Sequence, residues 1–150
     1  MKTKYAVQAC LHLARRHGQG RVLIADIAEA EAIPRKFLEL ILLELKNAGI
    51  LASRKGKGGG YTLAHPPGEV SLGSILRVIE GPIAPLSCVS QTEYKPCVEC
   101  PDPRICGLRL VMQDVRDAVA EVVDSTTLKD ILDRSAEAAA RGGGFMMFHI

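Results

Sequence analysis

Tryptophan is absent from this chain, and its 150 residues include only three phenylalanines and three tyrosines. Because apolar residues nevertheless make up 47% of the chain, we expect a core that is aliphatic. No apolar run approaches the roughly 20 residues that cross a bilayer. The N-terminal apolar run is broken by Gln8 and His12, ends at Arg15–Arg16 and lacks the small-residue cleavage site of a secretory signal. We therefore expect a cytoplasmic protein that does not enter a membrane.

The usual signs of enzyme chemistry are also missing. There is no pair of carboxylates arranged for acid–base catalysis and no nucleophile beside a base. The glycine-rich run KGKGGG at residues 55–60 leads into a strand pattern and not into a helix, which disfavours a nucleotide-phosphate loop. We expect neither an enzyme nor a small-molecule substrate.

Charge is divided unevenly along the chain. Residues 1–65 carry 11 Lys/Arg against 5 Asp/Glu, a net charge of +6, whereas residues 66–150 carry 8 against 12, a net charge of −4. A basic half indicates contact with a polyanion, and the acidic half indicates a different task.

The first helical pattern covers residues 4–16 and is amphipathic, with Val7, Leu11 and Ala14 on its apolar face. Cys10 lies on the same face, so we expect it to be a small buried hydrophobe and not a ligand. His12 is expected at the surface or at its boundary.

Two further patterns predict a helix-turn-helix. Residues 24–31 form a short helix, and after a break a second helix covers residues 35–48, with Pro34 at its first position and Gly49 as its stop. Two short helices joined by a tight turn, the second basic in its first turn, are typical of a DNA-recognition unit. The inward positions of the second helix are Leu38, Ile41, Leu42, Leu45 and Ala48.

A β-hairpin is expected directly after this unit, with strands at residues 50–54 and 61–63 around the glycine-rich turn. A hairpin in this place is a wing, whose basic side chains reach phosphates or a narrow minor groove. The alternative is a solvated hairpin whose charge is incidental. The residues predicted to contact DNA are Arg35, Lys36, Glu39 and Leu40 in the helix, and Arg54, Lys55 and Lys57 in the wing.

A long helix is expected over about residues 103–123, with Asp102 as its N-cap and Pro103 as its first residue. Its apolar positions recur in alternating steps of three and four, which is typical of a helix-pairing seam. Since DNA-binding modules of this kind usually read two half-sites, the seam predicts a homodimer; the alternative is a helix packed on its own subunit. The predicted interface residues are Leu108, Val111, Val115, Ala118 and Val122.

A capping box formed by Thr127 and Asp130 predicts a last helix over about residues 128–140. The tail FMMFHI that follows is apolar, and the sequence does not decide between docking on a partner and disorder. The residues of this helix expected to be buried are Leu128, Ile131, Leu132 and Ala139.

The predicted fold is mainly α with a small β-wing: a winged helix-turn-helix domain plus a long dimerisation helix. We expect the DNA-binding region over residues 1–82, ending in a helix over 71–80, a cysteine-rich loop over 83–107, and the dimerisation and C-terminal helices over 108–150.

Four of the five cysteines lie within 19 residues, at spacings C-x8-C-x2-C-x5-C, in a loop stiffened by three prolines. In a reducing compartment such a group indicates a metal site more than a disulfide framework. Two chemistries remain open, an iron–sulfur cluster and tetrahedral zinc. A thioredoxin-like site is disfavoured because no βαβ pattern surrounds the C-x2-C pair. The candidate ligands are Cys88, Cys97, Cys100 and Cys106.

The chain resembles the Rrf2 family of bacterial winged-helix regulators, which includes the IscR, NsrR and RirA types. The resemblance covers nearly the whole chain and rests on KYAVQACLHLA, IADIAEAEAIPRKFLELILLELKNAGIL, the wing RKGKGGGYTLA, LGSILRVIEGP, CGLRLVMQDVRDAV and STTLKDIL. It implies that the wing and recognition helix bind DNA, that the long helix forms a homodimer, and that loop cysteines hold an iron–sulfur cluster whose state tunes DNA affinity.

The resemblance carries over to the cysteines one by one. Cys100 and Cys106 match the family's last two cysteines, which have the same separation. Cys88 takes the place of the first at an atypical distance, and Cys97 has no usual counterpart.

The chain departs from the family pattern at the remaining ligand. Family members complete the site with a histidine three residues past the last cysteine or with a side chain of the first helix, and those positions here are Arg109 and Lys4 or Gln8. Arginine and lysine bind iron poorly, which points to Cys97 as the fourth ligand. A second departure is Ala32, where the family has glycine; a left-handed backbone there costs roughly 1–2 kcal/mol.

The sequence thus predicts a homodimeric transcription regulator that binds double-stranded operator DNA and holds a 2Fe-2S or 4Fe-4S cluster on its loop cysteines. One rival keeps DNA binding but makes the site structural zinc or a thiol-redox switch. The other is a protein-interaction adaptor that does not bind DNA.

Overall fold

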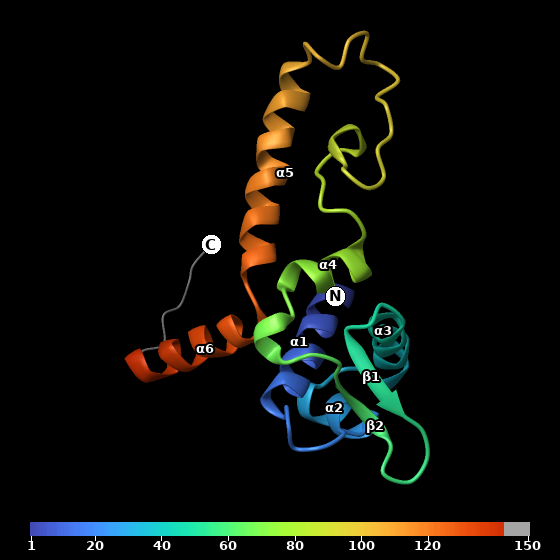
Figure 1. The fold of residues 1–150 in the computed structure, drawn as a ribbon, viewed down its shortest axis with the longest axis vertical. Helices are drawn as coiled ribbons and strands as arrows, with labels where there is room; N and C mark the ends of the chain where they lie inside the picture. Colours follow the sequence, from blue (N-terminus) through green and yellow to red (C-terminus); the bar gives the residue numbers. More distant parts are fainter. Residues whose placement is uncertain (143–150) are drawn as a thin grey trace.

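The computed structural model describes residues 1–142, which form a helical body with a β-hairpin at one edge and a long helix projecting from the opposite side (Figure 1). This mainly helical architecture with a small hairpin confirms the predicted fold class. The elements are α1 (Lys2–Arg15), α2 (Ile24–Glu31), α3 (Arg35–Asn47), β1 (Leu51–Arg54), β2 (Gly60–Leu63), the 3-10 turn η1 (Pro67–Glu69), α4 (Leu72–Glu80), the 3-10 turn η2 (Ser87–Val89), α5 (Gly107–Ser125) and α6 (Leu128–Gly142).

Helix α1 is the centre of the body, in contact with α2, α3, α4, α6 and β2. Its buried face is rich in small residues, including Ala6, Ala9 and Cys10, which let neighbouring helices approach closely. Cys10 is 0% exposed, and burial raises the pKa of its thiol to about 12. The expectation that Cys10 is a buried hydrophobe is therefore confirmed.

The core around α1 is aliphatic, as the composition predicts. Each fully buried Leu or Ile stabilises the fold by roughly 1.5–3 kcal/mol relative to an exposed one. The largest buried side chains are Leu13, Ile27, Leu38, Ile41, Leu42, Leu45, Ile75 and Leu128.

Helices α2 and α3 form the predicted helix-turn-helix. Helix α2 ends at Glu31, and its C-cap Ala32 adopts a left-handed conformation (φ 53°, ψ 44°). Pro34 is the N-cap of α3 and not its first residue, because the turn holds it extended (ψ 127°). Ala48, predicted to face inward, is an exposed C-cap, since the helix ends one turn beyond its last buried leucine, Leu45.

The prediction for His12 is wrong. This residue is 7% exposed, and its Nδ1 lies 3.0 Å from Oε1 of Glu31 at the end of α2. The same Glu31 oxygen also accepts from Arg15 at 3.4 Å. A carboxylate brought over by α2 allows a polar ring to be buried here, and the sequence of α1 alone does not reveal that partner.

Strands β1 and β2 pair antiparallel in the register Leu51↔Leu63 to Arg54↔Gly60, which puts both leucines on the core side. Val22 adds an isolated β-bridge to this two-stranded sheet: it exchanges two backbone hydrogen bonds with Tyr61, at 2.9 and 2.8 Å. Gly60 is needed at this junction, because a Cβ there would lie 2.5 Å from the carbonyl oxygen of Val22. The α1–α2 connection and the wing are therefore fixed to each other.

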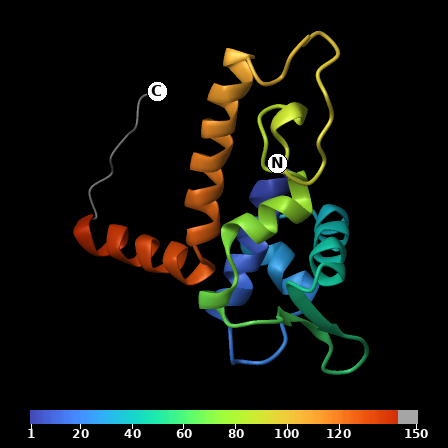
Figure 2. The ribbon, with the colours of Figure 1, turned by 45° about the horizontal axis from the view of Figure 1, so that its top comes forward.

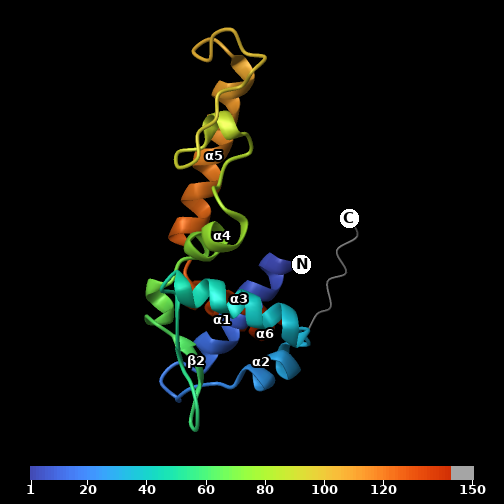
Figure 3. The same ribbon diagram turned by 90° about the vertical axis from the view of Figure 1, so that its right-hand side faces the viewer.

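Helix α5 stands away from the body in both Figures 1 and 3. It begins at Gly107 and not at residue 103, so the predicted cap at Asp102–Pro103 is wrong. The Asp102 carboxylate instead accepts hydrogen bonds from the backbone N–H (2.9 Å) and Nε (3.1 Å) of Arg104. Asp102 thus closes a local turn, which competes with helix initiation.

Helix α6 returns to the body and packs against α1 through the fully buried Leu128. Its capping box is confirmed: Thr127 N–H donates to Asp130 at 2.9 Å, and Asp130 N–H donates to the Thr127 hydroxyl at 3.1 Å. Ile131 and Leu132 are half-buried, but Ala139 is exposed because the helix extends past the body. The predicted tail at residues 145–150 lies outside the described residues.

Over the described part of the chain, no helix is long and apolar enough to cross a membrane. The division at residues 82 and 107 stays a prediction. The position of α6 against α1 means that the C-terminal segment contributes to the same core as the DNA-binding region.

Candidate DNA-binding surface and cysteine site

All four residues of α3 that are predicted to contact DNA lie on its outer, solvent-exposed face. Arg35, Lys36, Glu39 and Leu40 are exposed, while the other face of the helix is buried against α1. Arg35 Nε lies 3.4 Å from Glu39 Oε1, an i,i+4 pair in which each group orients the other. The pair leaves Arg35 with further donors for an acceptor in a groove.

The sequence reasoning missed Phe37, whose side chain is 61% exposed on this same face. Together with Leu40, Tyr5 and Met1 it lines an apolar hollow of about 450 Å³ between α3 and the start of α1. Helical period carried this signal, because residues 37 and 38 lie about 100° apart on a helix, which puts Phe37 at the edge of the buried stripe.

The wing presents its three basic residues to solvent. Arg54 ends β1, and Lys55 and Lys57 lie in the glycine-rich turn. In the described structure none of the three forms an ion pair within the chain, so their charge is available to an outside partner. Helix α3 and the wing lie on the same side of the body (Figure 1).

The predicted seam on α5 is exposed along its whole length. Val115, at its middle, is 41% exposed, and the seam residues Leu108, Val111, Ala118 and Val122 are exposed as well. Leu110 and Val119, which the prediction did not include, widen the apolar surface. An apolar stripe over 19 helical residues that nothing within residues 1–142 covers is what a paired helix needs.

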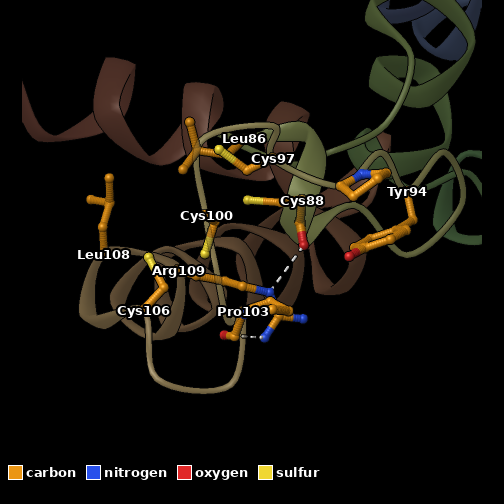
Figure 4. Close-up of a pocket in the computed structure, with 10 residues that line it drawn as sticks. Leu86, Cys88, Tyr94, Cys97, Cys100, Pro103, Cys106, Leu108 and Arg109 are labelled. Atoms are coloured by element: carbon orange, nitrogen blue, oxygen red, sulfur yellow. Dashed lines mark hydrogen bonds between the residues drawn. The ribbon is translucent and has the colours of Figure 1, made fainter.

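The four loop cysteines line one small hollow of about 100 Å³ where the loop meets the start of α5. Figure 4 shows their sulfur atoms gathered around the same space, with Arg109 crossing beside them. Cys88 comes from η2, Cys97 and Cys100 from the loop, and Cys106 is the N-cap of α5 and not a residue of its first turn. The rest of the lining is apolar apart from Arg109: Leu86, Tyr94, Pro96, Pro103 and Leu108.

Two arginines of α5 hold the cysteine-bearing turn η2 in place. Arg109 Nε donates to the carbonyl of Cys88 at 3.3 Å, and its Nη1 donates to the carbonyl of Pro103 at 3.4 Å. Two turns further along, Arg116 Nη1 donates to the carbonyl of Val89 at 2.7 Å. Val89 itself is buried, so η2 is anchored by packing and by charge-assisted hydrogen bonds. Sequence reasoning missed both arginine roles.

The sulfur atoms of this hollow are the type of ligand that a thiophilic metal ion or an iron–sulfur cluster prefers. All five cysteines are free, and the hollow contains thiols without carboxylates. The pKa of the Cys100 thiol is raised, chiefly by partial desolvation and secondly by the neighbouring thiol of Cys106. Within residues 1–142, however, no group of three or more Cys, His, Asp or Glu side chains is close enough to hold a metal ion. Ligation therefore requires the loop to draw its thiols closer together.

These features define a winged-helix DNA-binding regulator with a cysteine site, and comparison with known proteins gives its family. The Rrf2 family, described as an iron-dependent transcriptional regulator, matches residues 1–134. The chain is 43% identical over 141 residues to an rrf2-like HTH-type transcriptional regulator of Rhodobacter capsulatus, covering 92% of this chain and 94% of that protein. The chain belongs to the Rrf2 family of DNA-binding transcription regulators.

Two other similar proteins are named as different types of regulator, CymR and IscR. The HTH-type transcriptional regulator CymR of Bacillus subtilis is 36% identical over 130 residues, covering 87% of this chain and 86% of that protein. The solved structure of that CymR, titled the global cysteine regulator, has a TM-score of 0.73 at 34% identity and covers 89% of this chain and 95% of its own. The structure of T. potens IscR has a TM-score of 0.70 at 33% identity and covers 96% of this chain and 91% of its own. Both similarities confirm the winged-helix fold, and these relatives are regulators and not enzymes.

Proposed function

We propose that this chain is a homodimeric, cytoplasmic transcription regulator whose affinity for operator DNA depends on an iron–sulfur cluster held by Cys88, Cys97, Cys100 and Cys106. The observation that carries the proposal is the convergence of four free thiols on one hollow at the N-terminus of the projecting helix α5. Membership of a family described as iron-dependent supports it.

Cluster binding would change the loop that connects α4 to the start of α5. Cys88 and Cys106 are already fixed, by η2 and by the cap of α5, whereas Cys97 and Cys100 lie on the loop between them. A bound cluster would supply negative charge and a redox-active centre. Arg109 and the N-terminal end of α5 would offset that charge. Closing the loop would fix the orientation of α5, and with it the spacing of two DNA-binding bodies in a dimer.

The direct experiment is purification without oxygen, followed by a visible spectrum and metal analysis. Each loop cysteine changed to Ala should lose or alter the visible absorption, whereas Cys10→Ala, in the buried core, should retain it. A Cys97→Ala variant with the wild-type spectrum and iron content would show that the fourth ligand lies elsewhere. Zinc without iron, under adequate iron supply, would contradict the cluster.

A thiol switch or structural zinc is the second candidate, and one observation favours it. The chain is as similar in structure to CymR, titled a global cysteine regulator, as it is to an IscR. A related CymR structure is titled an oxidized form. Colourless protein whose DNA affinity changes with a thiol oxidant, and whose change is lost in a loop-cysteine variant, would establish this alternative.

DNA binding by the wing has its own test. Lys57→Ala should weaken binding to all sequences and lower the slope of log affinity against log salt by about 0.9, the value for one phosphate contact. The matched control is Lys95→Ala, which removes the same charge from the cysteine loop. Glu39→Ala should instead change sequence preference, because this carboxylate is predicted to accept from a cytosine amine. An unchanged salt slope in a Lys55→Ala/Lys57→Ala variant would contradict the wing assignment.

A further inference from the structure

A second basic segment lies beside the wing, in the connection between α1 and α2. Residues 16–21 read RHGQGR, and every one of them is exposed. Arg15, next to them, is occupied by Glu31, but within the described residues Arg16 and Arg21 form no ion pair. In Figures 1 and 2 this connection and the wing turn lie at the same lower edge of the body.

The bridge between Val22 and Tyr61 indicates where Arg21 points. Val22 pairs directly with Tyr61 and is buried, so it lies on the core side of the sheet. Successive side chains of a strand alternate between faces, which puts Arg21 on the outer face. On β1 the same alternation puts Ala52 and Arg54 outward, since Leu51 is buried. We call Arg21, Ala52, Arg54 and Thr62 the outer sheet face.

The outer sheet face is positive. Between its two arginines lie the small side chains of Ala52 and Thr62 and the bare backbone of Gly60, and the same alternation puts the exposed Leu23 at the edge of this face. From strand spacing and rise, the two arginine Cα atoms are roughly 12 Å apart. Neither the segment 15–23 nor the segment 50–65 contains an Asp or Glu. Arg16 extends the positive surface, and together with His17 it lines an adjoining hollow of about 280 Å³.

We propose that Arg16 and Arg21 are a second DNA-backbone contact, in which the outer sheet face and the α1–α2 connection bind phosphates flanking the groove reached by the wing. The inference rests on the proposed DNA-binding function and extends its footprint. A duplex carries one charge per about 1.7 Å of axis, so a surface of this size meets several phosphates. Contacts of this kind set register and affinity and carry no sequence information.

The test compares double variants that lose the same charge at two different places on the molecule. Arg16→Ala/Arg21→Ala should lower the salt slope by about two units, because each phosphate contact contributes about 0.9. The loss should be equal on the gene's own upstream DNA and on an unrelated duplex. The control, Arg134→Ala/Arg141→Ala on α6, should keep the wild-type slope. Arg16→Lys/Arg21→Lys keeps both charges and should retain the slope.

The outcomes separate this inference from the function on which it rests. Wild-type protein that binds DNA without salt dependence, or not at all, would contradict the proposed function. Wild-type protein that binds normally while the Arg16/Arg21 variant keeps its slope would overturn the second contact alone. An equal loss in the α6 control would also overturn it, since net charge would then explain the effect. A thermal melt of each variant checks folding, and if the alanine pair unfolds, the polar pair Arg16→Gln/Arg21→Gln replaces it with the same expected loss of slope.

Discussion

The DNA-binding body and the cysteine loop of this protein are built in opposite ways. The body, residues 1–80, buries a continuous aliphatic core around α1. In the loop, every residue from 91 to 99 is exposed, including Val98 at 100%. The loop is held at its ends, by Val89 and by two arginines that donate to backbone carbonyls.

This difference indicates which part of the molecule is free to respond to a signal. The body has its geometry before any ligand binds, because packing over-determines it. The loop buries too little apolar surface to fix its own conformation, so a bound metal or a new covalent bond would decide it. A sensor needs such a pair, one rigid part that reads DNA and one weakly held part that changes.

Cysteine reactivity should show the largest contrast between the two regions. Burial raises the pKa of Cys10 from 9.0 to about 12, which alone lowers its thiolate fraction at neutral pH by about a thousandfold. Cys97 is exposed. In metal-free protein, an alkylating reagent should therefore modify Cys97 at least about a thousandfold faster than Cys10. Mass spectrometry of the alkylated protein measures both rates. Comparable rates would mean that the body opens as readily as the loop.

Core truncation should show the next largest contrast. Leu38 is fully buried in α3, so Leu38→Ala should lower the free energy of unfolding by about 2–5 kcal/mol in urea titrations. Val98→Ala removes a similar apolar group from the loop, where nothing covers it, and should change stability by less than about 0.5 kcal/mol. If both variants lost similar stability, the loop would have a core of its own.

The body was predictable because local signals agree with the global fold there. Helix α2 has its predicted bounds, Ile24–Glu31, and the buried stripe Leu38, Ile41, Leu42 and Leu45 follows from helical period alone. The left-handed Ala32 was inferred only from family resemblance, since alanine carries no such signal.

The loop and its attachments were less predictable, because long-range contacts decide them. Asp102 followed by proline is a good helix start by propensity, yet its carboxylate binds Arg104 and α5 begins four residues after the expected position. The carbonyl contacts of Arg109 and Arg116 join residues 21 and 27 positions apart. A backbone carbonyl has no side-chain identity, so no sequence pattern marks it as a partner.

A charge in the middle of α5, the helix that follows the cysteine loop, tests whether that helix pairs with a partner. In the proposed dimer, Val115→Asp would bury two facing carboxylates, at a cost of several kcal/mol. Light scattering at micromolar concentration should then show monomer or aggregate. Val98→Asp, the same change on the exposed loop, should leave the dimer intact. A dimeric Val115→Asp protein would place the interface on another surface.

The junction between the body and α5 should show the smallest effect, and it is sensitive to pH. Arg77 of α4 donates to both carboxylate oxygens of Asp124 near the end of α5, at 2.5 and 2.9 Å. Gly73 faces the same carboxylate, and a Cβ there would overlap its Oδ1, so the pair fills the space between the helices. Because both side chains are more than one-third exposed, their coupling should be about 0.2–1 kcal/mol.

The hydrogen bonds from Arg77 lower the pKa of Asp124 in the folded protein. Asp124 therefore stabilises the fold above its unfolded pKa of about 3.9, and this contribution is lost as pH falls through the lower folded value. A double-mutant cycle of Asp124→Asn and Arg77→Gln, measured by urea unfolding, should give the coupling at pH 7 and lose it in strong acid. Asp102 and Asp130 also have lowered pKa values, but they are unchanged in all four proteins and cancel from the cycle. A coupling that persists at the lowest pH would mean that packing around Gly73, and not the ion pair, joins α5 to the body.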